Sequence, residues 1–132
     1  MRVDCNSLQD FAARALALCL REKSPAASEL RTLAEVNLIL VSDARIAALH
    51  RKFMNIAGPT DVITFHHGDV FISVETAAEQ ARQFGTSTVD ELRLYIVHGL
   101  LHLHGFDDTT EPARRKMHVV QRRVFKAAAR LN

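Results

Sequence analysis

The sequence predicts an α+β domain in which about five helices pack on one small mixed β-sheet. Short runs of aliphatic and β-branched residues cluster in the middle of the chain, between residues 33 and 74. Before and after them, apolar residues recur at intervals of three and four, which is typical of helices. The 132 residues, 48% apolar and 24% charged, suit one packed domain and do not indicate disorder. Strands in the middle and helices at both ends therefore favour this fold class.

The first helix is expected to start near Asn6 or Ser7, because both residue types readily cap a first turn. Apolar residues recur at helical spacing through residues 8–19, which indicates burial along one side. The residue before Pro25 is pushed out of the helical region, so the helix ends before that proline. Residues 33–41 then combine aliphatic and β-branched side chains and predict a strand.

Ser42 and Asp43 can cap a second helix, which Gly58 and Pro59 interrupt. We expect one face of this helix to be formed by Ile46, Leu49, His50 and Phe53. A short turn then separates two β-branched runs, which favours an antiparallel hairpin. The predicted parts of this hairpin are a strand at residues 62–65, a turn at 66–69 and a strand at 70–74.

Three further helices are predicted over about residues 75–84, 89–103 and 112–131. Gly85 and Gly105 close the first two, because a helix end commonly requires a residue in the left-handed conformation. Pro112 suits the first turn of the last helix.

The charge of the chain is nearly balanced, since 17 Lys and Arg oppose 15 Asp and Glu for a formal +2. Taken alone, this argues against binding nucleic acid through bulk charge. However, residues 112–132 carry +7 without a single Asp or Glu, which leaves −5 for the rest. One face of the last helix can therefore attract RNA phosphates, and its candidate contacts are Arg115, Arg122 and Lys126. A solvated helix face is the alternative interpretation.

The sequence has no run of about 18 apolar residues, so we expect no membrane span. The apolar stretch at residues 11–20 includes Arg14 and lacks a preceding basic segment, which predicts a helix rather than a signal peptide. Cys5 and Cys19 are too few for a disulfide scaffold and match no thiol metal motif. A reducing cytoplasm is the expected setting.

Histidines carry the most specific chemical signal. His98 and His102 are four residues apart on a predicted helix, so both rings lie on one face and can share a metal ion. His104 would point roughly 200° away from His102 and is a poor third ligand. Gly105 can stop the helix and reverse the chain, which lets Asp108 return to the metal. Two histidines at this spacing are also common as packing or surface residues, and this is the alternative.

The resulting pattern, H-x-x-x-H-x-x-G-x-x-D, has the spacing of the metzincin metallopeptidases. Those enzymes place a general-base glutamate directly after the first histidine, where this chain has Gly99. A peptidase is therefore disfavoured. Two histidines and one carboxylate leave an open metal position, which favours catalytic zinc, although iron(II) suits the same ligands. Asp107 can orient a ligand imidazole or simply form a turn.

Residues 98–108 resemble the signature H-G-x-L-H-L-x-G-(Y/F)-D-H of the YbeY family of endoribonucleases, also called ribosomal RNA maturation factors. Residues 58–65 are similar to the family's P-T-D-V-L-S-F segment, and residues 68–73 to its G-D-I-x-I-S strand. Residues 49–53 resemble its L-N-x-x-(Y/F) helix. The resemblance runs from about residue 33 to the C terminus, with the order and spacing of the segments kept.

This resemblance implies one α+β domain over residues 1–132 and a bound zinc ion. It implies cleavage of single-stranded RNA, with the small ribosomal subunit and its RNA as partners, in ribosomal RNA maturation and ribosome quality control. The family's three metal histidines correspond to His98, His102 and Asp108.

Several residues depart from the family pattern. Asp108 replaces the usual third histidine and would make the metal a weaker Lewis acid. Met54 replaces a functional arginine, which would bind phosphate bidentately. This departure favours the alternative of a non-catalytic ribosome-assembly protein that keeps the metal for folding. His66 stands where the family often has proline, and together with Asp107 it is a candidate general base.

Overall fold

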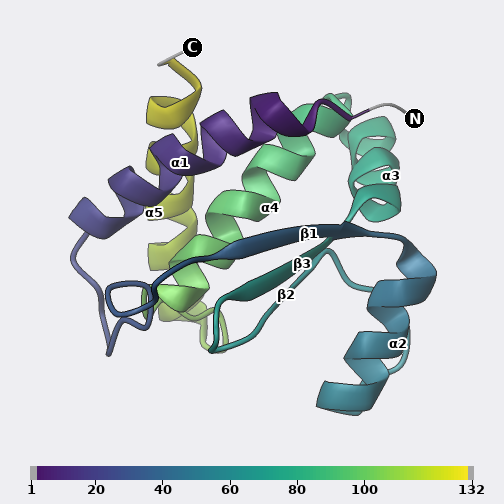
Figure 1. Ribbon diagram of the computed structural model, residues 1–132, viewed down its shortest axis with the longest axis horizontal. Helices are drawn as coiled ribbons and strands as arrows, with labels where there is room; N and C mark the ends of the chain where they lie inside the picture. Colours follow the sequence, from purple (N-terminus) through teal and green to yellow (C-terminus); the bar gives the residue numbers. More distant parts are fainter. Residues whose placement is uncertain (1–2, 131–132) are drawn as a thin grey trace.

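The computed structural model describes residues 3–130 and confirms the predicted α+β class with a small mixed sheet (Figure 1). Its elements follow in the order α1 (Cys5–Arg21), β1 (Asn37–Val41), α2 (Asp43–Met54), β2 (Val62–Thr64), β3 (Asp69–Ser73), α3 (Val74–Phe84), α4 (Thr88–Leu103) and α5 (Glu111–Arg130). None of these helices is long and apolar enough to cross a membrane.

The sheet has the order β1-β3-β2, so β3 lies in the middle. β1 runs parallel to β3, whereas β2 and β3 form the predicted antiparallel hairpin. Alternate residues of a strand face opposite sides. Val70 and Ile72 of β3 therefore join the main core, while Phe71 between them packs beside Ile63 on the other side.

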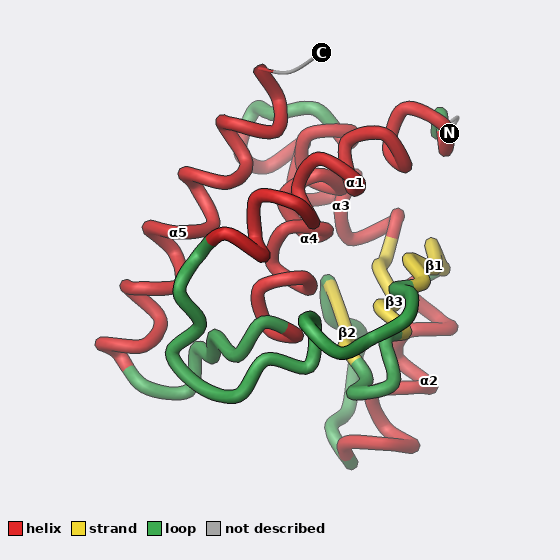
Figure 2. The backbone as a smooth tube through the Cα atoms, turned by 60° about the vertical axis from the view of Figure 1, so that its left-hand side comes forward, coloured by secondary structure: helices red, strands yellow, loops and turns green. Residues whose placement is uncertain are grey.

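Four helices lie on one side of the sheet, where α4 packs against it, and α2 covers the other side, as Figures 1 and 2 show from two directions. We call the α4 side the inner face and the α2 side the outer face. The main core lies on the inner side, between α1, α4, α5 and the sheet. A smaller cluster around Ile46, Leu49 and Ile63 holds α2 to the outer face. The sheet therefore separates a large inner core from a small outer cluster.

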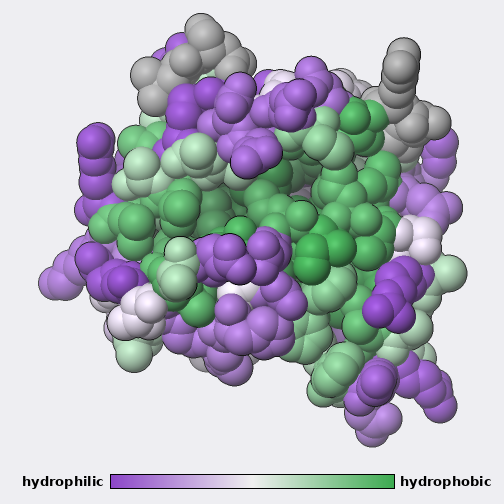
Figure 3. All heavy atoms as spheres, in the orientation of Figure 1, coloured by the Kyte–Doolittle hydropathy of each residue, from purple (hydrophilic) through white to green (hydrophobic). Residues whose placement is uncertain are grey.

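β1 forms one edge of the sheet, and a hollow of about 520 Å³ lies between it and α1. Its apolar lining includes Leu8, Leu38 and Leu40. Figure 3 shows hydrophobic side chains gathered across the middle of this face of the molecule. The strand is shorter than the predicted residues 33–41, because the backbone at Thr32 and Leu33 turns back to bond the carbonyl of Glu29.

Two helix boundaries differ from the sequence expectations. α1 is capped by Asp4, whose carboxylate accepts the backbone N–H of Ser7 at 3.1 Å, rather than by Asn6 or Ser7 themselves. α2 ends at Met54 with Asn55 in the left-handed conformation, before the expected stop at Gly58. The end of α4 agrees with the sequence expectation, because Gly105 adopts the left-handed conformation (φ +97) directly after the capping residue His104.

The predicted caps at Ser42 and Gly85 are confirmed. The expected apolar face of α2 is only partly correct, because Ile46 and Leu49 are buried whereas the Phe53 side chain is 56% exposed. Residue 131, the expected end of the last helix, lies outside the described residues.

Candidate metal centre

Two histidines of α4 lie on the side of the helix that is not buried in the core. Leu92, Ile96 and Leu100 of this helix are buried in the main core. His98 and His102 lie one turn apart, with ring centroids 4.5 Å from each other and side chains 24% and 23% exposed. The fixed geometry of a helix thus pairs the rings at the edge of the core.

The chain reverses immediately after α4. Gly105 has φ +97, and a Cβ there would meet the carbonyl oxygen of Ala26 at 2.8 Å, so this turn requires glycine. The backbone N–H of buried Phe106 then donates to the carbonyl of Leu101 at 3.0 Å. The reversal places Asp108 Oδ2 3.6 Å from His98 Nε2 and 3.7 Å from the same atom of His102.

The two imidazoles are oriented by hydrogen bonds on their far nitrogens. Nδ1 of His98 donates to Gln121 Oε1 of α5 at 2.7 Å. Nδ1 of His102 donates to the backbone carbonyl of Phe106 at 3.1 Å. A neutral ring that donates through Nδ1 keeps a lone pair on Nε2. The two Nε2 atoms lie 3.0 Å apart, so a cation bound by both would relieve the repulsion between their lone pairs.

The three donors fit a small divalent metal ion. Their ligand atoms all lie within 4.8 Å of one another. Metal–nitrogen bonds of about 2.0–2.1 Å in a tetrahedron require ligand atoms about 3.3 Å apart, and the three separations here are 3.0, 3.6 and 3.7 Å. Burial of the ring and the neighbouring His98 lower the pKa of His102 below its usual value, which favours the neutral form that binds metals.

Asp108 leaves the cluster open on one side, because its side chain is 41% exposed. Three protein ligands and an accessible fourth position are typical of catalytic rather than structural zinc sites. The arrangement can therefore hold a metal ion and still admit water or a substrate oxygen.

Gly99, the residue after the first histidine, faces the sheet. A Cβ at this position would lie 2.7 Å from Val70 Cγ1 and 3.4 Å from Thr64 Cγ2. The missing side chain therefore lets α4 approach the inner face closely. A metallopeptidase glutamate has no room here, which adds a steric argument to the one based on sequence.

The candidate general bases have other partners in the structure. The carboxylate of Asp107 accepts hydrogen bonds from the backbone N–H and the hydroxyl of Thr109, at 3.1 and 3.0 Å, and so forms the turn. His66 is 94% exposed and contacts Glu29 Oε2 through Nδ1 at 2.5 Å. Within residues 3–130, no hydrogen bond joins His66 to the three candidate ligands.

The expected RNA contacts on α5 are exposed, but part of the helix's charge is balanced. Arg115 lies 3.8 Å from the carboxylate of Glu111, whereas Arg122 contacts the uncharged partner His118, at 2.8 Å from its Nε2, and keeps its charge. Arg123 pairs with Glu22 beyond the end of α1 at 2.5 Å. Lys126 is exposed beside Arg122 and lines the same shallow hollow. The basic face of α5 is therefore narrower than the residue count indicates.

His104 is buried and serves the fold. Its two ring nitrogens lie 2.7 Å from the hydroxyl of Ser28 and 2.7 Å from the carbonyl of Glu22, so it fastens the segment after α1 to the end of α4. Sequence reasoning missed this role and the role of Gln121. The available signal for Gln121 was its position as a polar residue beside the apolar stripe of Met117, Val120 and Val124.

Comparison with known proteins now adds to this geometry. The sequence profile of the family described as Endoribonuclease YbeY matches residues 1–129. The chain belongs to the YbeY family. The resemblance seen in the sequence is thus confirmed, and membership in YbeY supports an endoribonuclease, a hydrolase that acts on RNA.

Several YbeY relatives share about a third of their residues with this chain. Endoribonuclease YbeY of Acidothermus cellulolyticus is 36% identical over 119 residues, which cover 74% of this chain and 73% of the relative. The protein of the same name from Heliobacterium modesticaldum is 34% identical over 113 residues, or 70% of this chain and 68% of the relative.

A solved structure resembles the same fold. The solution structure of TM1509 from Thermotoga maritima aligns over 97% of this chain and 85% of its own with a TM-score of 0.68 and 24% identity. Agreement over nearly the whole chain supports the arrangement of helices and sheet that positions the metal centre.

Proposed function

We propose that this YbeY protein is a zinc-dependent endoribonuclease that cleaves single-stranded RNA during small-subunit ribosomal RNA maturation and ribosome quality control. The observation that carries the proposal is the cluster formed by Asp108 and the two Nε2 atoms of His98 and His102, which lie 3.0 Å apart. Family membership supports RNA as the substrate. The proposal places the protein in the cytoplasm, with the small ribosomal subunit as partner.

In this proposal His98, His102 and Asp108 hold the metal, and Gln121 and the Phe106 carbonyl keep the rings oriented. A bound zinc ion supplies Lewis acidity to a phosphoryl oxygen and lowers the pKa of water.

The protein supplies the remaining functions. Arg115, Arg122 and Lys126 attract phosphates to the basic side of α5. A general base must take a proton from the attacking water, and Asp107 and His66 are the groups proposed for this role. Thr64 lies against α4 next to the first ligand, so β2 forms a wall of the proposed cleft.

The direct test combines metal analysis with RNA cleavage. We expect purified protein to contain one zinc ion per chain and to cleave single-stranded RNA in a manner that a chelator abolishes. Asp108→Ala and His98→Ala should lose both zinc and activity, while His50→Ala, which replaces a histidine of α2 outside the cluster, should retain both. Cleavage that persists in chelator would remove zinc from the mechanism, and a protein without metal would contradict the site.

A non-catalytic ribosome-assembly protein is the second candidate, and Met54 favours it. Its side chain is 48% exposed where the family has an arginine for phosphate. This candidate predicts ribosome association that survives Asp108→Ala without RNA cleavage by the wild type. Met54→Arg is the informative variant, because a gain of cleavage would show that the rest of the site is competent.

A further inference from the structure

The outer face of the sheet carries a second hollow, separate from the metal centre. It has a volume of about 530 Å³, within the usual range for small-molecule sites. We call it the outer groove. The residues that matter to its chemistry come from α2 and the β2–β3 hairpin: Arg45, Lys52, Phe53, Phe65, His67 and Phe71.

Aromatic rings form an array within the outer groove. Phe65 is central, with its ring centroid 5.2 Å from Phe53, 5.7 Å from Phe71 and 5.7 Å from His67. The rings of Phe65 and His67 are nearly parallel at 23°, whereas the two Phe pairs meet edge to face. Phe53 leaves 56% of its side chain exposed, so a flat surface is available to solvent.

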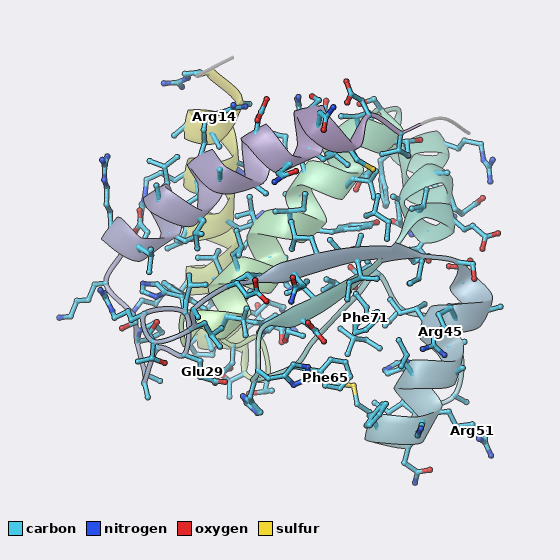
Figure 4. All side chains as sticks on the ribbon, in the orientation of Figure 1. Arg14, Glu29, Arg45, Arg51, Phe65 and Phe71 are labelled. Atoms are coloured by element: carbon cyan, nitrogen blue, oxygen red, sulfur yellow. The ribbon has the colours of Figure 1, made fainter. Side chains whose placement is uncertain are left out.

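Cationic side chains border these rings. Arg45 and Lys52 are exposed and line the groove, and the Lys52 ammonium lies 5.3 Å from the Phe53 ring centroid. Figure 4 shows Phe65 and Phe71 on the α2 side of the sheet, with Arg45 on the helix beside them. The acidic residue in the lining is Asp69, whose carboxylate is already bonded to Asn37 and His67 at 3.2 and 2.8 Å.

The groove and the metal centre are separated by one thin strand. Thr64 of β2 touches the inner-face helix at Gly99, next to the first metal ligand, whereas Phe65, the next residue, packs on the outer side. β2 is three residues long and lies at the edge of the sheet. The two surfaces therefore lie on opposite sides of one short edge strand.

From this arrangement we propose that the outer groove is a second contact site for single-stranded RNA. An unpaired base stacks on the exposed Phe53 ring, while Arg45 and Lys52 bind the adjoining phosphates. Exposed aromatic rings bordered by cations suit unpaired bases, whose faces a duplex keeps hidden. The inference rests on the proposed function, because it assigns the groove to the same RNA that the metal centre would cleave.

A tryptophan reporter tests the contact directly. The chain contains no tryptophan, so Phe53→Trp introduces a single tryptophan at the exposed ring, which can be excited selectively beside the one tyrosine. With EDTA present to prevent metal-dependent cleavage, we expect a short single-stranded oligoadenosine to quench this fluorescence. The matched control is Phe84→Trp, which replaces a phenylalanine that is 68% exposed on α3, and it should not respond.

Affinity measurements separate stacking from charge. Phe53→Leu keeps an apolar side chain but removes the ring, and we expect RNA affinity by fluorescence anisotropy to fall by roughly 5- to 100-fold. Lys52→Gln should weaken binding at low salt and have little effect at high salt. Phe84→Leu should leave the affinity unchanged.

Two results would overturn the inference. One is the absence of quenching in Phe53→Trp, or equal quenching in Phe84→Trp. The other is quenching by an acidic, apolar peptide but not by RNA, since this would make the groove a protein-docking site. If the wild type does not cleave RNA but RNA still quenches Phe53→Trp, only the proposed function is rejected. The two failures are therefore distinguishable.

Discussion

Gln121 determines which nitrogen of His98 faces the candidate metal, although it contributes no ligand atom itself. Its Oε1 accepts the Nδ1 proton at 2.7 Å. We expect Gln121→Ala to weaken zinc binding by about 10- to 100-fold, because the imidazole loses its fixed orientation. Isothermal titration calorimetry measures this, with Gln121→Glu as the control that retains an acceptor. Unchanged affinity in the alanine variant would show that α4 alone orients the ring.

Gly99 permits the close contact between α4 and the sheet. A Cβ would lie 2.7 Å from Val70 Cγ1, so Gly99→Ala should destabilise the fold by about 1–3 kcal/mol through overpacking. Urea unfolding measures the loss. Val70→Ala makes room for the new methyl group, and the double variant should be more stable than the sum of the two single effects predicts. Simple additivity would contradict the contact.

The clustering of the three candidate ligands could be predicted at this scale, because they lie in one short segment. Helical spacing pairs His98 with His102, and a glycine stop returns Asp108, so local rules suffice. The orienting groups were not predictable in the same way. Gln121 reaches His98 from another helix, and the packing that brings the helices together is not encoded by any local spacing.

At the scale of elements, α1 buries one face completely, and Cys19 on that face has an exposed fraction of 0%. Burial first, and the nearby Glu22 second, raise the pKa of its thiol to about 12. The folded protein therefore keeps this thiol protonated at pH values where the unfolded chain begins to ionise, near 9. Stability should fall as pH rises from about 9 towards 12.

Urea unfolding across this pH range measures the effect, and Cys19→Ala should show a smaller decline. Exposed Cys5 provides an internal comparison, because iodoacetamide should modify it in the folded protein while Cys19 reacts only after unfolding. Rapid modification of Cys19 in the folded protein would contradict the buried face.

The order and type of the elements and the β2–β3 hairpin followed from sequence patterns, but some boundaries and the pairing of β1 with β3 did not. Residues 33–36 continue the apolar pattern of a strand, yet the backbone at Thr32 and Leu33 bonds back to Glu29. The parallel pairing of β1 with β3 joins segments more than thirty residues apart. This pairing depends on how α2 folds over the sheet. The alternation of apolar and polar residues along a strand is a local pattern and does not specify it.

At the scale of the whole molecule, positive charge is concentrated on the last helix although the net charge of the chain is small. Within the last helix, Arg122 and Lys126 lie together at one shallow hollow, whereas Arg123 is paired with Glu22. We expect Arg122→Gln with Lys126→Gln to reduce the salt dependence of RNA binding, lowering the slope of log K against log salt by about 1.4 if both bind phosphate.

Fluorescence anisotropy with labelled RNA over a range of salt concentrations measures this slope. Arg82→Gln on α3 is the matched control, since its guanidinium is paired with Glu79 within the same helix. An unchanged slope in the double variant would show that these α5 residues do not contact RNA phosphates, so that other surfaces must attract the RNA.

The short span of the candidate ligands has a consequence for the order in which the chain folds. Asp108 follows His98 by ten positions, whereas the paired residues Asn37 and Asp69 of the parallel strands are 32 positions apart. Closing the shorter loop around an ion therefore costs about 1 kcal/mol less in chain entropy. A metal ion can thus be captured by α4 and its turn before the sheet is complete. If so, zinc should accelerate refolding in stopped-flow experiments, and His98→Ala should remove that acceleration.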